Sequence, residues 1–323
     1  MNKKFISDLK TDEQFESVFL LSQKSRKLTK HDKPYLEILL ADKSGKIEGR
    51  VWDNADEFNA NVREGDIVKV KGAVVSYRDI KQVKVDGLVK ASPGEYSHTD
   101  MIRALENIGA IIEKISAYFR KIKDPWIKKL ADDILGDDDM MARFAEGAGA
   151  KNWHNAYVGG LAEHTYEVMF IADSMSELYP EADADILLMG SFLHDIGKIF
   201  EINSKKMDYT IEGSLLGHIT IGHKIFVEKA NAIQGFPEDT KLHLEHIILS
   251  HHGEYEQQSP VLPKTLEANI IYHSDNLVSQ ANAIREIRRA QSDGEKVWSD
   301  FVSIKNRRFY LKTGKATPPE RIL

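Results

Sequence analysis

The spacing of apolar residues changes near residue 100, and this change constrains the fold more than any other feature of the sequence. Between residues 15 and 90, apolar and polar residues alternate in short runs that are separated by turn signals such as Asp42-Lys-Ser-Gly45. Such alternation is typical of half-buried strands. From Met101 onward, apolar residues recur every three or four positions, which is the spacing of amphipathic helices. The sequence therefore predicts a multidomain chain, an all-β part followed by an all-α part.

The β part is expected to form a small barrel or sandwich, because several short strands follow one another closely and are joined by turns. The predicted strands include 35–41, 46–52, 67–75 and 82–86, and 91–97 is a candidate linker. The predicted helices cover 101–122, 124–135, 138–148, 160–178, 182–196, 214–233, 239–252 and 264–290.

Composition excludes several kinds of chemistry. The chain has 323 residues and no cysteine, so disulfides, thiolate-bound zinc and cysteine nucleophiles are excluded. We see no secretory signal at the N-terminus, and no apolar run approaches the roughly 18 residues of a membrane span. We therefore expect a cytoplasmic protein that does not bind membranes.

The net charge of −6 is distributed unevenly along the chain. Residues 1–95 carry 18 Lys and Arg against 16 Asp and Glu, residues 96–284 carry 16 against 29, and residues 285–323 carry 10 against 5. An acidic body between two mildly basic segments suits a metal enzyme that acts on a polyanion. Ordinary solvated surface charge is the alternative interpretation.

Histidines gather around one His-Asp doublet. Ten of the twelve histidines lie between His154 and His273, and the doublet His194-Asp195 ends an apolar run. On helices of 3.6 residues per turn, His164, His251 and Asp275 each share a face with apolar residues.

A single histidine on such a face is usually a hydrogen-bonded core residue. Two of them on different helices, together with the doublet and an inward carboxylate, favour a divalent metal site instead.

In this order, the residues resemble the HD-domain superfamily of metal-dependent phosphohydrolases over about residues 150–280. The motifs are Gly159-Gly-Leu-Ala-Glu-His164, Leu193-His-Asp-Ile-Gly-Lys198, Ser250-His-His-Gly253 and His273-Ser-Asp275. The resemblance implies two divalent ions, manganese above all, with iron, cobalt or zinc as alternatives. Asp195 is expected to bridge the ions, which would lower the pKa of a shared water. The expected metal ligands are His164, His194, Asp195, His218, His251 and Asp275.

Some assignments stay open at the sequence level. His223 could replace His218 as a ligand. His252 could replace or join His251. Two further histidines could orient ligands or simply pack in the core: His246 and His273.

The expected catalytic residues are Asp195 and Lys198. The resemblance to HD-Gly-Lys phosphodiesterases implies that Lys198 contacts a substrate phosphate. An exposed lysine at a helix end is the alternative for that residue.

The N-terminal barrel resembles an OB-fold of the kind that binds single strands. Such folds combine a positive groove with aromatic side chains on which bases stack. Trp52, close to Arg50 on a predicted strand, is the best candidate, with barrel packing as the alternative. The full set of candidate nucleic-acid-binding residues is Tyr35, Arg50, Trp52, Tyr77 and Arg78.

An OB-type barrel followed by an HD domain resembles the bacterial YhaM-type 3′–5′ exoribonucleases over essentially the whole chain. We thus expect an OB-fold nucleic-acid-binding domain over residues 1–95 and a helical HD domain with a basic C-terminal segment over 96–323. The resemblance implies hydrolysis of single-stranded RNA, or also DNA, to nucleoside 5′-monophosphates, and a homo-oligomer is an option. The alternatives are an HD phosphohydrolase of small nucleotides and a sequence-specific DNA-binding protein.

Overall fold

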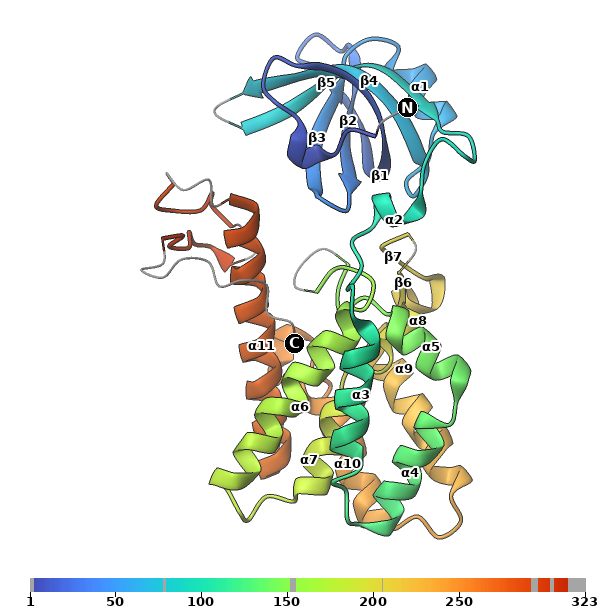
Figure 1. Cartoon of the computed structure of the whole chain (residues 1–323), viewed down its shortest axis with the longest axis vertical. Coiled ribbons are helices and arrows are strands. Elements are labelled where there is room, and N and C mark those ends of the chain that lie inside the picture. Colours follow the sequence, from blue (N-terminus) through green and yellow to red (C-terminus); the bar gives the residue numbers. More distant parts are fainter. Residues whose placement is uncertain are drawn as a thin grey trace. The chain divides into compact units, whose positions relative to one another are not determined.

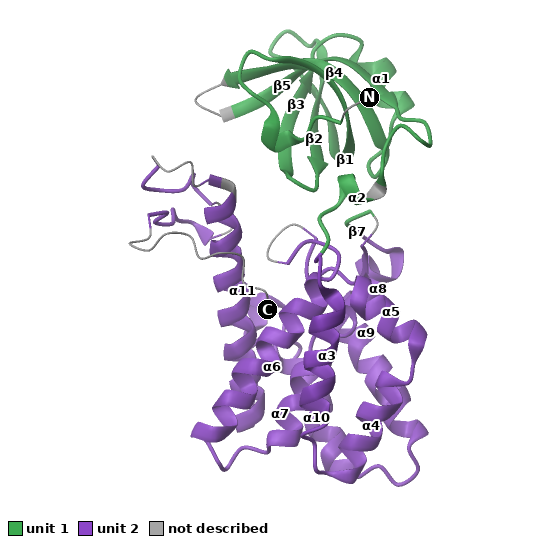
Figure 2. Cartoon of the chain, in the orientation of Figure 1, with its two compact units in different colours: residues 1–104, 205–207 green, residues 105–204, 208–323 purple. Residues whose placement is uncertain are grey.

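The structure of the chain is a computed structural model (Figure 1). It describes residues 3–77, 80–151, 155–204, 206–291, 296–302 and 305–312. The chain divides into two compact units, Met1–Ala104 with Lys205–Met207 and Leu105–Ser204 with Asp208–Leu323 (Figure 2). Each unit has its own hydrophobic core.

The first unit is a five-stranded closed barrel. Its strands are β1 (Gln14–Leu28), β2 (Pro34–Asp42), β3 (Gly45–Val51), β4 (Ile67–Tyr77) and β5 (Ile80–Lys90), in the order β1-β2-β3-β5-β4. All neighbours are antiparallel except β3 and β5, which are parallel. A short helix, α1 (Ala55–Asn61), connects β3 to β4. This is the topology of an OB-fold and confirms the predicted fold class.

Alternation along the strands fills the barrel. On β2, Leu36, Ile38 and Leu40 are buried because every second side chain points inward. A bulge between Lys71 and Gly72 bends β4 over β5. A Cβ at Gly72 would lie 2.3 Å from the carbonyl oxygen of Lys84, so the crossing requires glycine.

The second unit is helical. After α2 (His98–Met101) at the end of the first unit, it contains α3 (Ile108–Phe119), α4 (Pro125–Leu135), α5 (Asp138–Glu146), α6 (Gly160–Leu178), α7 (Ala184–Leu193), α8 (Lys198–Glu201), α9 (Ile211–Ala232), α10 (Glu238–Ser250) and α11 (Leu266–Gln291). A two-stranded ribbon, β6 (Ile202–Asn203) and β7 (Asp208–Tyr209), connects α8 to α9. Short 3-10 turns lie at Ile6–Asp8 and Tyr255–Gln257.

Helix α7 lies at the centre of this unit. Its N-terminus is capped by Asp183, whose side chain accepts from the backbone N–H groups of Asp185 and Ile186. Every residue from Ile186 to Leu193 is buried, and α6, α10 and α11 pack around it. The doublet His194-Asp195 at its C-terminal end therefore lies in the middle of the helix bundle.

The structure differs from the sequence prediction mainly in short elements. The predicted helix 101–122 is shorter, because α3 covers only Ile108–Phe119 and α2 is separate. The helix predicted at 214–233 begins earlier, at Ile211, because Thr210 caps the N-terminus of α9. Among the described residues, none of the helices combines the length and the apolarity that crossing a membrane requires.

Candidate metal centre

Five helix segments bring His and Asp side chains to one place in the helical unit. His164 lies on α6, the doublet His194-Asp195 follows α7, and the other contributors are on α9, at the end of α10 and on α11. His164 and His194 are completely buried, and Asp195 is 2% exposed. Charged and polar groups at such depth require partners, so their mutual geometry is informative.

A first ligand group consists of four side-chain atoms. His164 Nε2 lies 3.2 Å from His194 Nε2 and 3.1 Å from Asp275 Oδ1. Asp195 Oδ2 lies 3.5 Å from His164 Nε2 and 3.4 Å from His194 Nε2. We call His164, His194, Asp275 and this oxygen of Asp195 the first ligand group.

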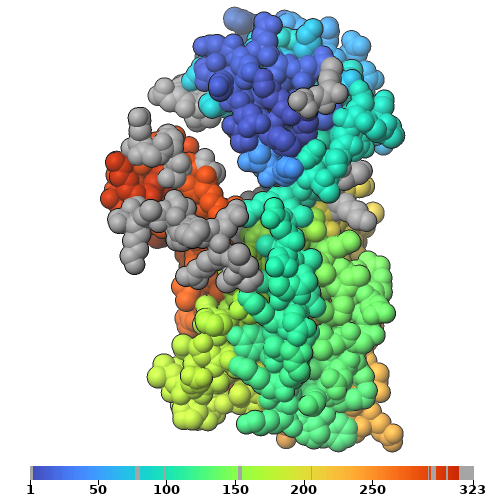
Figure 3. Space-filling view, viewed as in Figure 1, coloured from blue at the N-terminus to red at the C-terminus, as the bar shows by residue number. Residues whose placement is uncertain are grey.

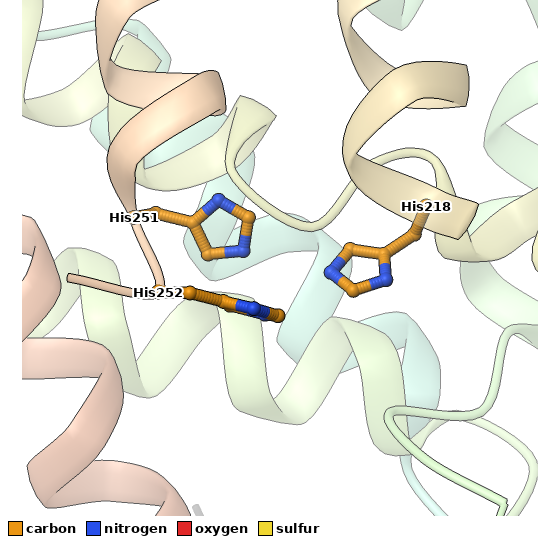
Figure 4. Close-up of side chains that lie close together, drawn as sticks. All are labelled: His218, His251 and His252. Carbon is orange, nitrogen blue, oxygen red and sulfur yellow. The ribbon is translucent and has the colours of Figure 1, made fainter. Parts of the chain in front are cut away.

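A second ligand group surrounds the other oxygen of the same carboxylate. Asp195 Oδ1 lies 3.4 Å from His218 Nε2 and 3.6 Å from His251 Nε2. The rings of His218, His251 and His252 face one another, each offering a nitrogen within 4.8 Å of the others (Figure 4). We call Asp195 Oδ1 and these three histidines the second ligand group.

The arrangement fits a divalent cation in each group. Ligands about 2.1 Å from one ion lie roughly 3.0–3.4 Å apart for right-angled to tetrahedral geometry. The distances of 3.1–3.6 Å around His164 and the two oxygens of Asp195 are close to that range. Within the described residues, Asp195 Oδ1, His218 Nε2 and His251 Nε2 are buried and have no hydrogen-bond partner. Buried polar atoms are normally paired, so these three atoms point to a ligand.

Hydrogen bonds to the far side of the imidazoles prepare them as ligands. The Nδ1 atoms of His194, His251 and His252 face the carbonyl oxygens of Ser191, Ile248 and Gln257 at 2.6, 2.8 and 2.7 Å. A carbonyl only accepts, so each Nδ1 carries a proton and donates it. The lone pair of each ring is then on Nε2, which in His194 and His251 is the atom that faces Asp195.

Glu201 does the same for His218. Its Oε1 accepts from the backbone N–H of His218 at 2.9 Å and from the ring Nδ1 at 3.0 Å. Sequence analysis did not identify Glu201, which lies at the end of α8, a helix that was not predicted. Contact between Glu201 and His218 depends on the β6–β7 ribbon returning the chain to α9.

The electrostatics of four other ligands agree with this picture, whereas for His194 the effect of burial is outweighed by Asp195, and the pKa of this ring is raised. Burial raises the pKa of Asp195, but the neighbouring Lys198 and His194 outweigh it and hold that pKa well below its usual value. Burial also raises the pKa of Asp275, but His164 outweighs this effect and lowers that pKa. Burial lowers the pKa of His251, and it lowers the pKa of His252 to about 4. The carboxylates are thus charged and these two rings neutral at pH 7, which are the protonation states that metal ligands need.

A close contact between two backbones positions His218. Helix α9 is interrupted at Gly217, whose φ of 70° and ψ of 155° turn the chain. Next to this kink, a Cβ at Gly197 would lie 2.0 Å from the carbonyl oxygen of His218. Only glycine allows the segment after Asp195 to approach α9 so closely, and the approach places His218 beside the doublet.

A buried polar network fixes α6 next to α11. Tyr157 Oη and Asn155 Nδ2 both donate to Glu163 Oε2, the latter at 3.0 Å. Asn282 on α11 donates to Asn155 Oδ1 at 3.0 Å and also to Glu167. These bonds hold the helix that carries His164 against the helix that carries Asp275. Glu167, which accepts one of these hydrogen bonds, has a raised pKa because it is buried.

The metal centre opens into a cavity of about 200 Å³. Lys198 lines it, and its Nζ donates to Asp195 Oδ2 at 2.6 Å. This lysine is largely buried rather than an exposed helix-end residue, since its side chain is only 11% exposed. The cavity is lined by Asp195, Lys198, His252, Gln257, Tyr272, Asp275, Asn276, Ser279, Gln280 and Lys305.

Three candidate histidines lie outside the two ligand groups. His223 Nε2 lies 3.8 Å from Glu245, and its side chain is 34% exposed. His246 Nε2 accepts from the backbone N–H of Lys264 at 2.9 Å, and burial lowers its pKa. His273 is exposed, and its ring is tilted by 40° against that of Tyr272, with centroids 4.6 Å apart. The structure thus brings together His218 rather than His223, and both His251 and His252.

The barrel carries an aromatic pair at the predicted nucleic-acid site. The rings of Tyr35 and Trp52 stack with centroids 4.8 Å apart, and Trp52 is 37% exposed. Arg50 Nη1 lies 3.4 Å from Glu37 Oε1. Tyr77 belongs to β4, but its side chain is not described, and Arg78 lies outside the described residues.

Comparison with known families agrees with this geometry. Residues 161–279, which carry both ligand groups, match a family model described as the HD domain. This part of the helical unit is thus similar to HD domains. Members of that family are metal-dependent phosphohydrolases that bind divalent cations. Residues 21–97 match a second family model, described as an OB-fold nucleic acid binding domain.

Several solved structures resemble part of the chain. The second OB-fold domain of replication protein A from Methanococcus maripaludis is 22% identical, over 28% of this chain and 97% of that one, with a TM-score of 0.24. Asparaginyl-tRNA synthetase from Pyrococcus horikoshii is 18% identical, over 42% of this chain and 36% of that one, with a TM-score of 0.24. No function follows from likenesses at these scores.

Proposed function

We propose that this protein is a metal-dependent nuclease that hydrolyses single-stranded nucleic acid. One observation carries the proposal: the two oxygens of Asp195 face two separate ligand groups, in a chain that also contains an OB-fold. A carboxylate shared in this way is what a two-ion centre for phosphate-ester hydrolysis requires. The OB-fold is the reason why we propose a strand of nucleic acid as the substrate.

Each ligand group would hold one cation. The first ion would be held by His164, His194, Asp195 and Asp275, and the second by Asp195, His218, His251 and His252. Two such ions supply a water that is activated at neutral pH and stabilise charge on the phosphate oxygens. Ligands of nitrogen and oxygen alone suit manganese, which we propose first, and also iron, cobalt or zinc.

The remaining residues orient the ligands and the substrate. Lys198 binds Asp195 Oδ2 while it lines the cavity, so its ammonium both fixes the carboxylate and offers positive charge to a phosphate. On the barrel, the stacked rings of Tyr35 and Trp52 offer an aromatic surface to bases.

The finer parts of the proposal rest on the resemblance to YhaM-type enzymes. These parts are the 3′–5′ direction, the preference for RNA, the release of nucleoside 5′-monophosphates and a cytoplasmic location. An OB-fold and an HD domain together support hydrolysis of nucleic acid more generally.

The proposal is tested by incubating the protein with single strands labelled at either end, in RNA and DNA form, with a panel of divalent metals. A 3′–5′ exonuclease releases the 3′ label at once as a mononucleotide and shortens the 5′-labelled strand stepwise. Cleavage of mononucleotides alone would contradict the proposal and favour a small-nucleotide phosphohydrolase. A shifted but intact duplex in the presence of manganese would instead favour a DNA-binding protein.

Asp195→Asn gives the matching prediction for the site. The change removes the charge shared by both ligand groups, so we expect strand hydrolysis to fall at least a thousandfold while strand binding is retained. Asp132→Asn, on the exposed side of α4, is the matched control and should leave both unchanged. Wild-type turnover by Asp195→Asn protein would refute the assigned role of this carboxylate.

A further inference from the structure

A small two-stranded arm follows α11. It comprises residues 296–302 and 305–312 and is the red part of the described surface in Figure 3. Trp298 pairs with Tyr310 and Val302 with Arg307 in antiparallel bridges. The Leu311 N–H donates to the Val297 carbonyl at 2.9 Å, and these bonds define a ribbon.

The arm is attached to the helical unit along one side. The Asp300 N–H donates to Gln291 at 2.8 Å, and Arg288 on α11 donates to the Tyr310 carbonyl at 3.3 Å. Ser299 and Leu311 are 2% and 4% exposed, so their side of the ribbon packs inward. The arm is therefore a folded element with one buried face.

The opposite face of the ribbon is aromatic and basic. Side chains alternate along strands, so Trp298, Tyr310 and Arg308 lie opposite the buried positions. Trp298 and Tyr310 are 54% and 51% exposed, and their rings meet edge to face with centroids 5.5 Å apart. Exposed large aromatics at this density mark an interaction surface.

The arm reaches the metal centre through Lys305. This residue lines the same cavity as Asp195, Lys198 and Asp275. Residues 296–312 carry five Lys and Arg against one Asp, whereas 96–284 are strongly acidic. A polyanion that enters the cavity therefore meets an excess of positive charge on the arm, in addition to that of Lys198, although the surrounding body is acidic overall.

We propose that the arm is a second strand-binding surface, which holds the nucleotides next to the scissile phosphate. Trp298 and Tyr310 provide stacking surfaces for a base, and Lys305 contacts a backbone phosphate at the mouth of the cavity. Exposed aromatics among basic residues are the composition that binds single strands. The position of Lys305 in the lining of the cavity, together with the positive charge of the arm, favours a nucleic-acid strand over a second copy of this chain. This inference rests on the proposed function and deepens it.

Binding is measured in an Asp195→Asn background, so that the strand is not consumed. Fluorescence anisotropy of a labelled 12-nucleotide RNA gives the Kd of Trp298→Ala and Lys305→Ala variants. We expect Trp298→Ala to weaken binding about tenfold, since stacking of one base is worth that much. Lys305→Ala should reduce the slope of log Kd against log salt by about one phosphate contact. Tyr179→Ala, an exposed aromatic at the far end of α6, is the matched control.

Turnover supplies a second readout. With Asp195 intact, Trp298→Ala should raise KM for the strand by a larger factor than it lowers kcat. The ratio of strand turnover to turnover of bis(p-nitrophenyl) phosphate, which is too small to reach the arm, should fall. Circular dichroism and thermal unfolding of each variant verify that the fold is retained.

The outcomes separate the arm from the proposed function. If strands are hydrolysed and both arm variants bind like the Tyr179→Ala control, the arm proposal is overturned and the nuclease proposal stands. If no strand is hydrolysed but Trp298→Ala still weakens binding, the arm proposal stands and the nuclease proposal fails. Sedimentation of the Trp298→Ala protein covers the remaining alternative. If the variant changed the sedimentation coefficient of the protein but not its Kd for the strand, the arm would be a subunit contact and its strand-binding role would be overturned.

Discussion

At the residue scale, Asp195 connects the two ligand groups, because each of its oxygens faces a different one. Four histidines of the ligand groups, His194, His218, His251 and His252, are held from behind by hydrogen bonds that fix which nitrogen carries the proton. Glu201 has this role for His218 and lies outside both ligand groups. We expect such orienting residues to affect metal affinity without touching the metal.

Glu201→Ala should weaken binding of the cation in the second ligand group by about 10- to 100-fold, the usual effect of losing such an orienting partner. Glu201→Gln keeps an oxygen acceptor for the His218 ring and should recover part of the loss. Titration calorimetry with Mn²⁺ measures both. Glu212→Ala, at an exposed position on α9, is the control. Equal affinities for the Ala and Gln variants would show that the hydrogen bond to His218 is not the cause.

The sequence predicted candidate metal ligands but not the residues that orient them. Helical spacing predicted inward faces for His164, His251 and Asp275, and the structure places all three side chains in the ligand groups. Spacing could not separate His218 from His223, since the kink at Gly217 decides which one faces Asp195. Contacts created by a kink or a ribbon depend on tertiary structure, which the pattern of apolar residues does not encode.

At the scale of elements, the approach of the α7–α8 turn to α9 determines the second ligand group. Gly197→Ala would place a methyl group 2.0 Å from the His218 carbonyl oxygen. We expect a loss of about 2–4 kcal/mol in the free energy of unfolding, as for other overpacked sites, together with weaker binding of one cation.

Gly109→Ala is the control for Gly197→Ala. It lies in α3 with nothing within 4 Å of the added Cβ. Replacing a helical glycine by alanine should stabilise the fold by about 0.5–1 kcal/mol. Chemical denaturation measures both changes. If the two variants had the same stability, the close approach at Gly197 would not constrain the fold.

Long helices were predictable and short elements were not. Helices α4 and α6 lie within a residue of their predicted limits, because periodic patterns of that length are distinctive. Helices α1 and α8 and the β6–β7 ribbon were missed, since a few residues cannot show a period. The ribbon matters for function because it brings Glu201 to His218.

At the scale of the whole molecule, an OB-fold and a candidate metal centre are present in one chain. The barrel and the HD domain were both predicted from sequence, and the family models match the same regions. The arm was recognised only as a basic, aromatic segment, because its pairing and its contact with the cavity depend on tertiary structure. Two aromatic surfaces, Tyr35 with Trp52 and Trp298 with Tyr310, are the proposed contacts for bases.

The central claim is that two cations share Asp195. It is tested most directly by the electron paramagnetic resonance spectrum of the protein loaded with two equivalents of Mn²⁺. Two ions bridged by one carboxylate should give an exchange-coupled spectrum, and Asp195→Asn should abolish the coupling. A six-line spectrum from isolated Mn²⁺ in the wild-type protein, or no bound Mn²⁺ after dialysis, would contradict the claim.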